Sequence, residues 1–228
     1  MPKLFRKTIA GLALLAIAAW APTAYGADQN SGQTDFKLGE HYVELSKPYV
    51  KISKSAQHKI ETVLFLWYNC PSCYRLDTDI NQWVENLPDD VEFIRLPAIF
   101  GHPAVDLHAR IFMTLEILGA DNTVHVKVFD LFQRQKQVVN AVAELPSLAQ
   151  KLGFDPDKFV ETFNSPAVDA EMERVQKLID IYRVNVVPTI IINGKYAYDS
   201  GMVGGVPNFT DLADILIEKE RQAANPAQ

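Results

Sequence analysis

The chain has 228 residues, with 22 lysines and arginines against 28 aspartates and glutamates, 48% hydrophobic residues and only two cysteines. This composition excludes a disulfide-stapled miniprotein, a disordered chain and a protein with many membrane spans. A formal net charge of −6 provides no basic surface for the phosphates of a nucleic acid. One or two globular domains remain, and no nucleic acid is expected as a partner.

Residues 1–26 have the pattern of a secretory signal peptide. Lys3, Arg6 and Lys7 precede an apolar run, and small residues occupy the positions that signal peptidase reads before Ala27. The apolar run is about 12 residues long, against the roughly 20 that span a bilayer. We therefore expect cleavage and no stable membrane insertion; an uncleaved anchor is the alternative. The mature chain then carries 19 basic and 28 acidic residues.

A strand–helix–strand unit follows a polar lead-in over 28–37. Residues 41–45 alternate in polarity and predict an edge strand. The apolar run 62–68 is typical of a strand buried on both faces. Apolar residues then recur at three- and four-residue intervals over 71–87, which predicts an amphipathic helix, and 91–96 predicts another strand. Together these elements predict a βαβ unit.

Residues 103–182 change to helical periodicity and predict an inserted helical domain. Asp155-Pro156 and Ser165-Pro166 are typical helix starts, with a capping side chain before a proline. After the insertion, 186–192 predicts a strand. The turn residues Asn193-Gly194 lead into a return strand over 195–198, and a last helix is expected over 208–222. The fold class is therefore α/β.

The segment Cys70-Pro71-Ser72-Cys73 is where chemistry is expected. It follows a buried strand and starts a helix, so the helix dipole and unpaired backbone N–H groups should lower the pKa of Cys70 below the free value of about 8.5. We expect Cys70 to be the exposed nucleophile and Cys73 to be the buried resolving thiol, with Pro71 and Ser72 tuning the pair. A bridge closing so short a loop stabilises little, so it is expected to be redox-active.

Other interpretations of the cysteine pair find little support. A zinc site commonly needs four ligands, and the chain has no third cysteine. A Cys–His hydrolase needs a positioned base, and no histidine has an identifying local signature; two inert core cysteines are a further alternative. No metal and no cofactor are expected. The histidines are expected to be surface or hydrogen-bonded polar residues: His41, His58, His102, His108 and His125.

Two segments carry a resemblance to a known family. One is Cys-Pro-Ser-Cys-Tyr from Cys70; the other is Val187-Pro188 followed by Ile-Asn-Gly-Lys-Tyr, with Pro188 lying 118 positions after Cys70. With these, the mature chain resembles the DsbA family of periplasmic thiol oxidases over nearly its whole length. The resemblance implies a thioredoxin fold, in parts 27–102 and 183–228, around the inserted helical domain. It also implies a cis peptide bond at Pro188 and a Val187 backbone beside Cys70 that pairs with extended substrates.

The function that this resemblance implies is a periplasmic oxidase. It donates its Cys70–Cys73 disulfide to reduced exported proteins and is reoxidised by a membrane quinone reductase of the DsbB type. The alternatives are a periplasmic disulfide reductase or isomerase, and a thioredoxin-fold binding module or holdase without net redox turnover. Known isomerases resemble DsbC, which has an N-terminal dimerisation domain. Too few residues precede the βαβ unit here for such a domain, and a monomer is expected.

Two residues depart from the best-known members of the family. Ser72 occupies a position where those members have histidine, and Leu64 occupies a position where they have a buried glutamate. A serine hydroxyl carries no charge, so we expect it to stabilise a Cys70 thiolate less than an imidazolium would. Without an acid at position 64, we expect the Cys73 proton to be carried by water or another group.

Overall fold

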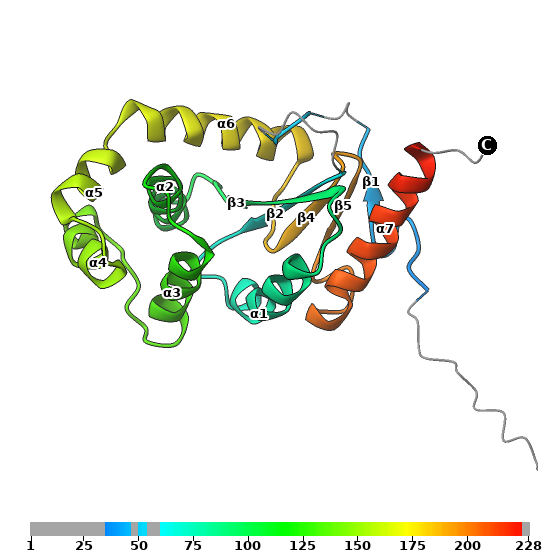
Figure 1. Cartoon of the computed structure of the whole chain (residues 1–228), viewed down its shortest axis with the longest axis horizontal. Helices are drawn as coiled ribbons and strands as arrows, with labels where there is room; N and C mark the ends of the chain where they lie inside the picture. The colour runs from blue at the N-terminus through cyan, green and yellow to red at the C-terminus, as the bar shows by residue number, and fades with distance from the viewer. Residues whose placement is uncertain (1–34, 47–49, 54–59, 225–228) are drawn as a thin grey trace, which may run out of the picture. The chain divides into compact units, whose positions relative to one another are not determined.

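The computed structural model describes residues 35–46, 50–53 and 60–224, and the predicted signal peptide over 1–26 lies outside these ranges. The described residues form a five-stranded sheet in the order β1-β5-β4-β2-β3 (Figure 1). Strands β2 and β3 are parallel, and the other neighbouring pairs are antiparallel. The strands are β1 (Val43–Glu44), β2 (Ile60–Leu66), β3 (Val91–Pro97), β4 (Thr189–Ile192) and β5 (Tyr196–Asp199).

Helices α1 and α7 lie next to each other beside the sheet, and the helices between β3 and β4 gather beyond β3 and along the sheet (Figure 1). The predicted α/β class is confirmed. None of the helices within the described ranges combines the length and apolar character needed to cross a bilayer. The helices are α1 (Pro71–Glu85), α2 (Pro103–Ile117), α3 (Asn122–Gln133), α4 (Leu145–Leu152), α5 (Pro156–Phe163), α6 (Pro166–Tyr182) and α7 (Phe209–Ala224), with 3₁₀ turns η1 (Val142–Glu144) and η2 (Val206–Asn208).

Local capping fixes where several helices begin, as the sequence predicts. The Asp155 side chain accepts a hydrogen bond from the Lys158 amide at 2.8 Å, and the Ser165 hydroxyl accepts one from the Val168 amide at 3.4 Å. In both cases the next residue is proline at the first helical position, where its missing N–H costs nothing. The predicted starts of α5 and α6 are therefore confirmed.

Two predicted strands are wrong at the end that faces the cysteines. The strand predicted over 62–68 stops at Leu66, because Trp67 begins a turn. In this turn the Trp67 carbonyl accepts a hydrogen bond from the Cys70 amide at 2.9 Å. The strand predicted over 186–192 starts only at Thr189, since the Thr189 hydroxyl donates to the Val186 carbonyl at 2.7 Å and closes a turn there. The apolar runs continue through these turns, so composition did not mark the boundaries.

The remaining predicted strands and helices lie close to their observed places. The edge strand expected over 41–45 is reduced to Val43–Glu44, where Val43 pairs with Ala197 of β5. The return strand is shifted by one residue, and α7 begins one residue later and ends two residues later than expected. Element ends commonly differ by this much.

The packing of α1 against the sheet predicts a large cost for a cavity there. Ile80 on α1 is fully buried, whereas Ile215 on α7 is 39% exposed. We expect Ile80→Ala to lower the free energy of unfolding by about 2–5 kcal/mol, and Ile215→Ala by less than about 1 kcal/mol. Denaturant unfolding of both variants checks this, and equal losses would contradict the placement of α1.

Candidate active site

The cysteine pair lies where a turn after β2 leads into α1, with Cys70 at the end of the turn and Cys73 in the first turn of the helix. The Cys70 amide donates to the Trp67 carbonyl at 2.9 Å, and Pro71 then begins the helix. Cys70 is the N-cap residue of α1, and its Sγ accepts a hydrogen bond from the Cys73 amide at 3.3 Å. Both cysteines are free thiols. The sequence therefore places a sulfur where capping residues usually supply an oxygen.

The hydrogen bonds around Cys70 favour its thiolate. The pKa of Cys70 is lowered to about 6, chiefly because the Cys73 thiol donates a hydrogen bond to it, with further help from the Ser72 hydroxyl and the backbone N–H groups of Cys73 and Ser72. Burial opposes this shift. The Ser72 oxygen lies 3.1 Å from Cys70 Sγ. The expected tuning contact from Ser72 is thus present in the geometry.

Cys73 has the opposite electrostatic environment. Burial, followed by its hydrogen bond to Cys70 and the charge of the Cys70 thiolate, raises the pKa of Cys73 well above the usual value. The pair therefore contains one thiol that ionises easily and one that keeps its proton.

The expectation that Cys70 is exposed is wrong in the reduced structure. Cys70 is 6% exposed and Cys73 is 4% exposed, so both count as buried. Their surface exposure is nearly equal, so the low pKa of Cys70 comes from the hydrogen bonds that its sulfur accepts, which outweigh the burial that leads the rise in the pKa of Cys73.

The segment before β4 lies against Cys70, as expected. The Val187-Pro188 peptide bond is cis, and Cys70 Sγ lies 3.6 Å from the Val187 carbonyl oxygen. The pairing of Phe65 in β2 with Thr189 in β4 fixes this position, because it brings the end of one strand beside the start of the other.

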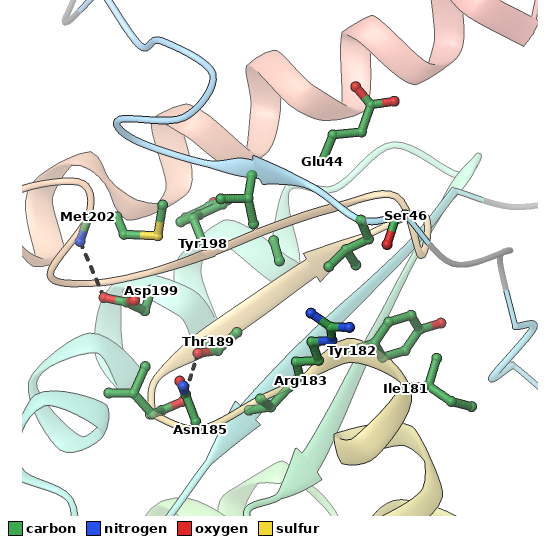
Figure 2. Close-up of a pocket in the computed structure, with 15 residues that line it drawn as sticks. Glu44, Ser46, Ile181, Tyr182, Arg183, Asn185, Thr189, Tyr198, Asp199 and Met202 are labelled. Carbon is green, nitrogen blue, oxygen red and sulfur yellow. Dashed lines mark hydrogen bonds between the residues drawn. The ribbon is translucent and has the colours of Figure 1, made fainter.

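A cavity of about 290 Å³ lies beside the Val187-Pro188 segment (Figure 2). Its lining includes Asn185, Val186 and Thr189, together with parts of β1, β5 and the end of α6, and neither cysteine belongs to it. The cavity is therefore a neighbour of the thiol pair and not part of it.

Several polar side chains near the cysteines are absent from the sequence-based predictions. Gln133 of α3 donates to the Tyr68 carbonyl at 3.0 Å, and the Tyr74 hydroxyl donates to Asp130 at 3.1 Å. His108 and His125 are buried and hydrogen-bonded, as expected of them. No local signal marks these contacts, since each joins residues that are far apart in the chain.

Leu64 lies in β2 with 4% of its surface exposed, between Arg95 of β3 and Ile190 of β4. A half-buried acid lies on α1, where Asp77 follows Cys73 by four residues on the same helix face. Burial raises the pKa of Asp77, and its carboxylate lies 4.0 Å from the Arg95 guanidinium.

No group of three metal-ligating side chains occurs in the part of the chain that the structure covers.

The sequence is similar to proteins of known name over most of its length. A family model described as a DSBA-like thioredoxin domain matches residues 93–216. The thiol:disulfide interchange protein DsbA of Pseudomonas aeruginosa is 41% identical over 212 residues, which cover 93% of this chain and 96% of that relative. This chain belongs to the DsbA family. The DsbA of Burkholderia cepacia is 29% identical over 220 residues, covering 96% of this chain and 97% of the relative.

Solved structures of the DsbA family share the fold. The crystal structure of Pseudomonas aeruginosa DsbA matches with a TM-score of 0.78 at 41% identity, covering 84% of this chain and 97% of the other. The oxidoreductase DsbA of Xylella fastidiosa matches with a TM-score of 0.72 at 29% identity, covering 80% and 96%. The predicted thioredoxin fold is therefore confirmed, and thiol–disulfide oxidoreduction is the chemistry of this DsbA family member.

The contact between Ser72 and Cys70 predicts how this DsbA family member responds to substitution. Ser72→Ala should raise the pKa of Cys70 by on the order of one unit, because one hydrogen bond to the thiolate is lost. Ser72→His should lower the pKa and raise the redox potential by roughly 30 mV per unit of pKa. Thiolate absorbance against pH and equilibration with glutathione measure the two quantities. An unchanged pKa in both variants would show that the helix start alone controls Cys70.

Proposed function

We propose that this chain is a periplasmic oxidase that passes a disulfide between Cys70 and Cys73 to reduced exported proteins. The observation that carries the proposal is the contrast between the two thiols, with the pKa of Cys70 lowered to about 6 and that of Cys73 raised. A stable Cys70 thiolate is a good leaving group, which favours the reduced form of the pair and makes its disulfide a strong oxidant.

The proposed exchange proceeds in two steps. A client thiolate attacks Cys70 Sγ, the Cys70–Cys73 bond breaks, and Cys73 leaves with the electron pair and takes up a proton. A second client thiolate then attacks the client sulfur of the mixed disulfide and releases Cys70 as a thiolate. Two electrons pass from the client to the enzyme, and the client gains one disulfide. In the reverse direction Cys70 is the nucleophile and Cys73 resolves the mixed disulfide.

We assign substrate pairing to Val187 and Pro188. The Val187 carbonyl lies 3.6 Å from Cys70 Sγ, so an extended client segment that pairs with this backbone brings its sulfur to Cys70. Pro71 and Ser72 are assigned to tuning of the thiol pair, since they occupy the first helical positions beside it.

The remaining assignments follow from the family and the sequence pattern. We propose a signal peptide over 1–26, thioredoxin-fold parts over 27–102 and 183–228, and a helical domain over 103–182. The proposed reoxidant is a membrane quinone reductase of the DsbB type, and the protein is proposed to act as a monomer in the periplasm of a Gram-negative bacterium.

The redox potential separates oxidase from reductase. A potential of about −120 mV, the value of a known DsbA, suits an oxidase, and one of about −270 mV suits a reductase. Turnover on a reduced, unfolded client distinguishes both from a binding module, which would hold the client without changing its thiols. A low potential together with reduction of client disulfides would overturn the oxidase assignment.

The different roles of the two cysteines predict which variant traps clients. Cys73→Ser leaves Cys70 without a resolving thiol, so mixed disulfides with clients should accumulate several-fold above those of the native protein. Cys70→Ser removes the sulfur that forms the mixed disulfide and serves as the matched control. Non-reducing gels of cell extracts measure both. Equal trapping by the control would reverse the assignment of roles.

The lowered pKa of Cys70 also predicts how stability depends on pH. Unfolded cysteine ionises at about 8.5, so the stabilisation from the folded thiolate is full above that pH and is lost as pH falls through about 6. Relative to the oxidised form, the reduced form should gain about 2 kcal/mol between about pH 5 and pH 8. Unfolding of both redox forms across this range measures the difference. A gap that does not change with pH would contradict the shifted pKa.

A further inference from the structure

The turn that leads into Cys70 is held by side chains of the inserted helices. The turn comprises Trp67, Tyr68, Asn69 and Cys70, and the Cys70 amide closes it onto the Trp67 carbonyl. The Trp67 indole N–H donates to Nδ1 of His108 on α2 at 2.8 Å. The second residue of the turn, Tyr68, makes more contacts with the inserted helices than Trp67 does.

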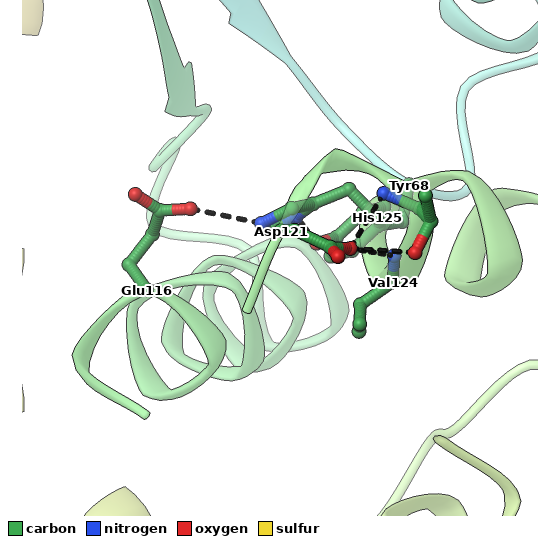
Figure 3. A network of polar contacts seen from close by, with 6 residues as sticks. Tyr68, Glu116, Asp121, Val124 and His125 are labelled. Atoms are coloured by element: carbon green, nitrogen blue, oxygen red, sulfur yellow. Dashed lines mark hydrogen bonds and ion pairs between the residues drawn. The ribbon is translucent and has the colours of Figure 1, made fainter. Parts of the chain in front are cut away.

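Tyr68 belongs to a buried chain of hydrogen bonds that ends at the surface (Figure 3). Its hydroxyl lies 2.5 Å from Nδ1 of His125 on α3, and Nε2 of His125 lies 2.8 Å from the carboxylate of Glu116 on α2. Tyr68 is 1% exposed and His125 is 5% exposed, whereas the Glu116 side chain is 49% exposed. The chain thus connects the second residue of the turn to solvent.

The direction of these bonds follows from what each group can donate. A carboxylate only accepts, so His125 donates to Glu116 from Nε2, and in the tautomer that carries its proton on Nε2 the ring accepts from the Tyr68 hydroxyl at Nδ1. Burial raises the pKa of Tyr68 well above its usual range, which keeps the phenol protonated as a donor. Glu116 therefore orients the ring of His125, and His125 orients Tyr68.

The Tyr68 ring is packed among aromatic rings of α2 and α3. It contacts Phe112 of α2 at a centroid distance of 5.7 Å, and Phe129 and Phe132 of α3 at 5.2 and 6.0 Å. These rings offer no acceptor of comparable strength for a hydroxyl, and a buried hydroxyl without a partner is costly. Loss of the acceptor at His125 must therefore displace Tyr68 or admit water.

We propose that His125 is a positioning residue for Cys70, acting through Tyr68. The inference rests on the proposed function, in which Cys70 is the sulfur that clients reach. The bond from the Cys73 amide to Cys70 Sγ is 3.3 Å long, and its strength depends on where the turn places Cys70. By fixing Tyr68, His125 holds the turn at the position where Cys70 caps α1.

The test compares the pKa of Cys70 in variants that break or keep the Tyr68–His125 bond. Tyr68→Phe and His125→Phe should each raise the pKa by about half a unit, a roughly threefold loss of acidity. The double variant should shift it no further than the larger single effect, because both changes remove the same bond. His125→Asn, whose amide oxygen occupies the place of Nδ1, should restore the native value.

A matched control separates positioning from general stability. The Tyr198 hydroxyl, also buried, donates to the Phe209 carbonyl at 2.5 Å on a different part of the sheet. Tyr198→Phe should lower the melting temperature as Tyr68→Phe does and leave the pKa of Cys70 unchanged. If both tyrosine variants lose stability and neither changes the pKa, His125 has only a structural role. A shift in His125→Asn as large as that in His125→Phe would also overturn the proposal.

The measurement is independent of client turnover. Thiolate absorbance of the reduced full-length mature protein gives the pKa of Cys70 without any substrate, so an inactive native protein would overturn the proposed function alone. If His125→Phe does not fold, the comparison of Tyr68→Phe with Tyr198→Phe still decides the outcome, since each removes a single oxygen.

Discussion

The capping arrangement at Cys70, in which its sulfur accepts hydrogen bonds from the thiol and from the amide of Cys73, is the interaction on which the site depends. It exists because α1 begins immediately after a turn, so that the first N–H groups of the helix have no backbone partner. A sulfur in the capping position takes the place of an oxygen and gains stability as an anion. Reactivity at Cys70 is therefore a consequence of where a helix starts.

The sheet supplies the second half of the site from a distant part of the chain. Antiparallel pairing of β4 with β2 sets Thr189 opposite Phe65, and this register leaves Val187 beside Cys70. A slip of one residue in this pairing would turn every side chain of β4 to the other face. Burial of β4 on both faces and its two neighbouring strands hold the register that the chemistry needs.

Local patterns in the sequence predicted those features that are themselves local. The helical periodicity of residues 103–182, the capping of α5 and α6 and the cysteine pair at a helix start were all predicted correctly. Long-range contacts decide the rest: the turns that end β2 and precede β4 lie within apolar runs, and the bond between Tyr68 and His125 joins residues 57 positions apart. The near-equal burial of Cys70 and Cys73 likewise depends on packing that no spacing encodes.

The helical insertion also determines the order in which the site is assembled. The contact between Cys70 and Val187 spans 117 positions in the chain, and all of α2 to α6 lies between them. A chain that emerges with its N-terminus first therefore presents both thiols long before the backbone that is to lie beside them. Contacts of such large sequence separation slow folding because a long loop must close first. The nascent protein thus passes through a stage in which its own cysteines are unprotected thiols, open to the same exchange that the finished fold controls.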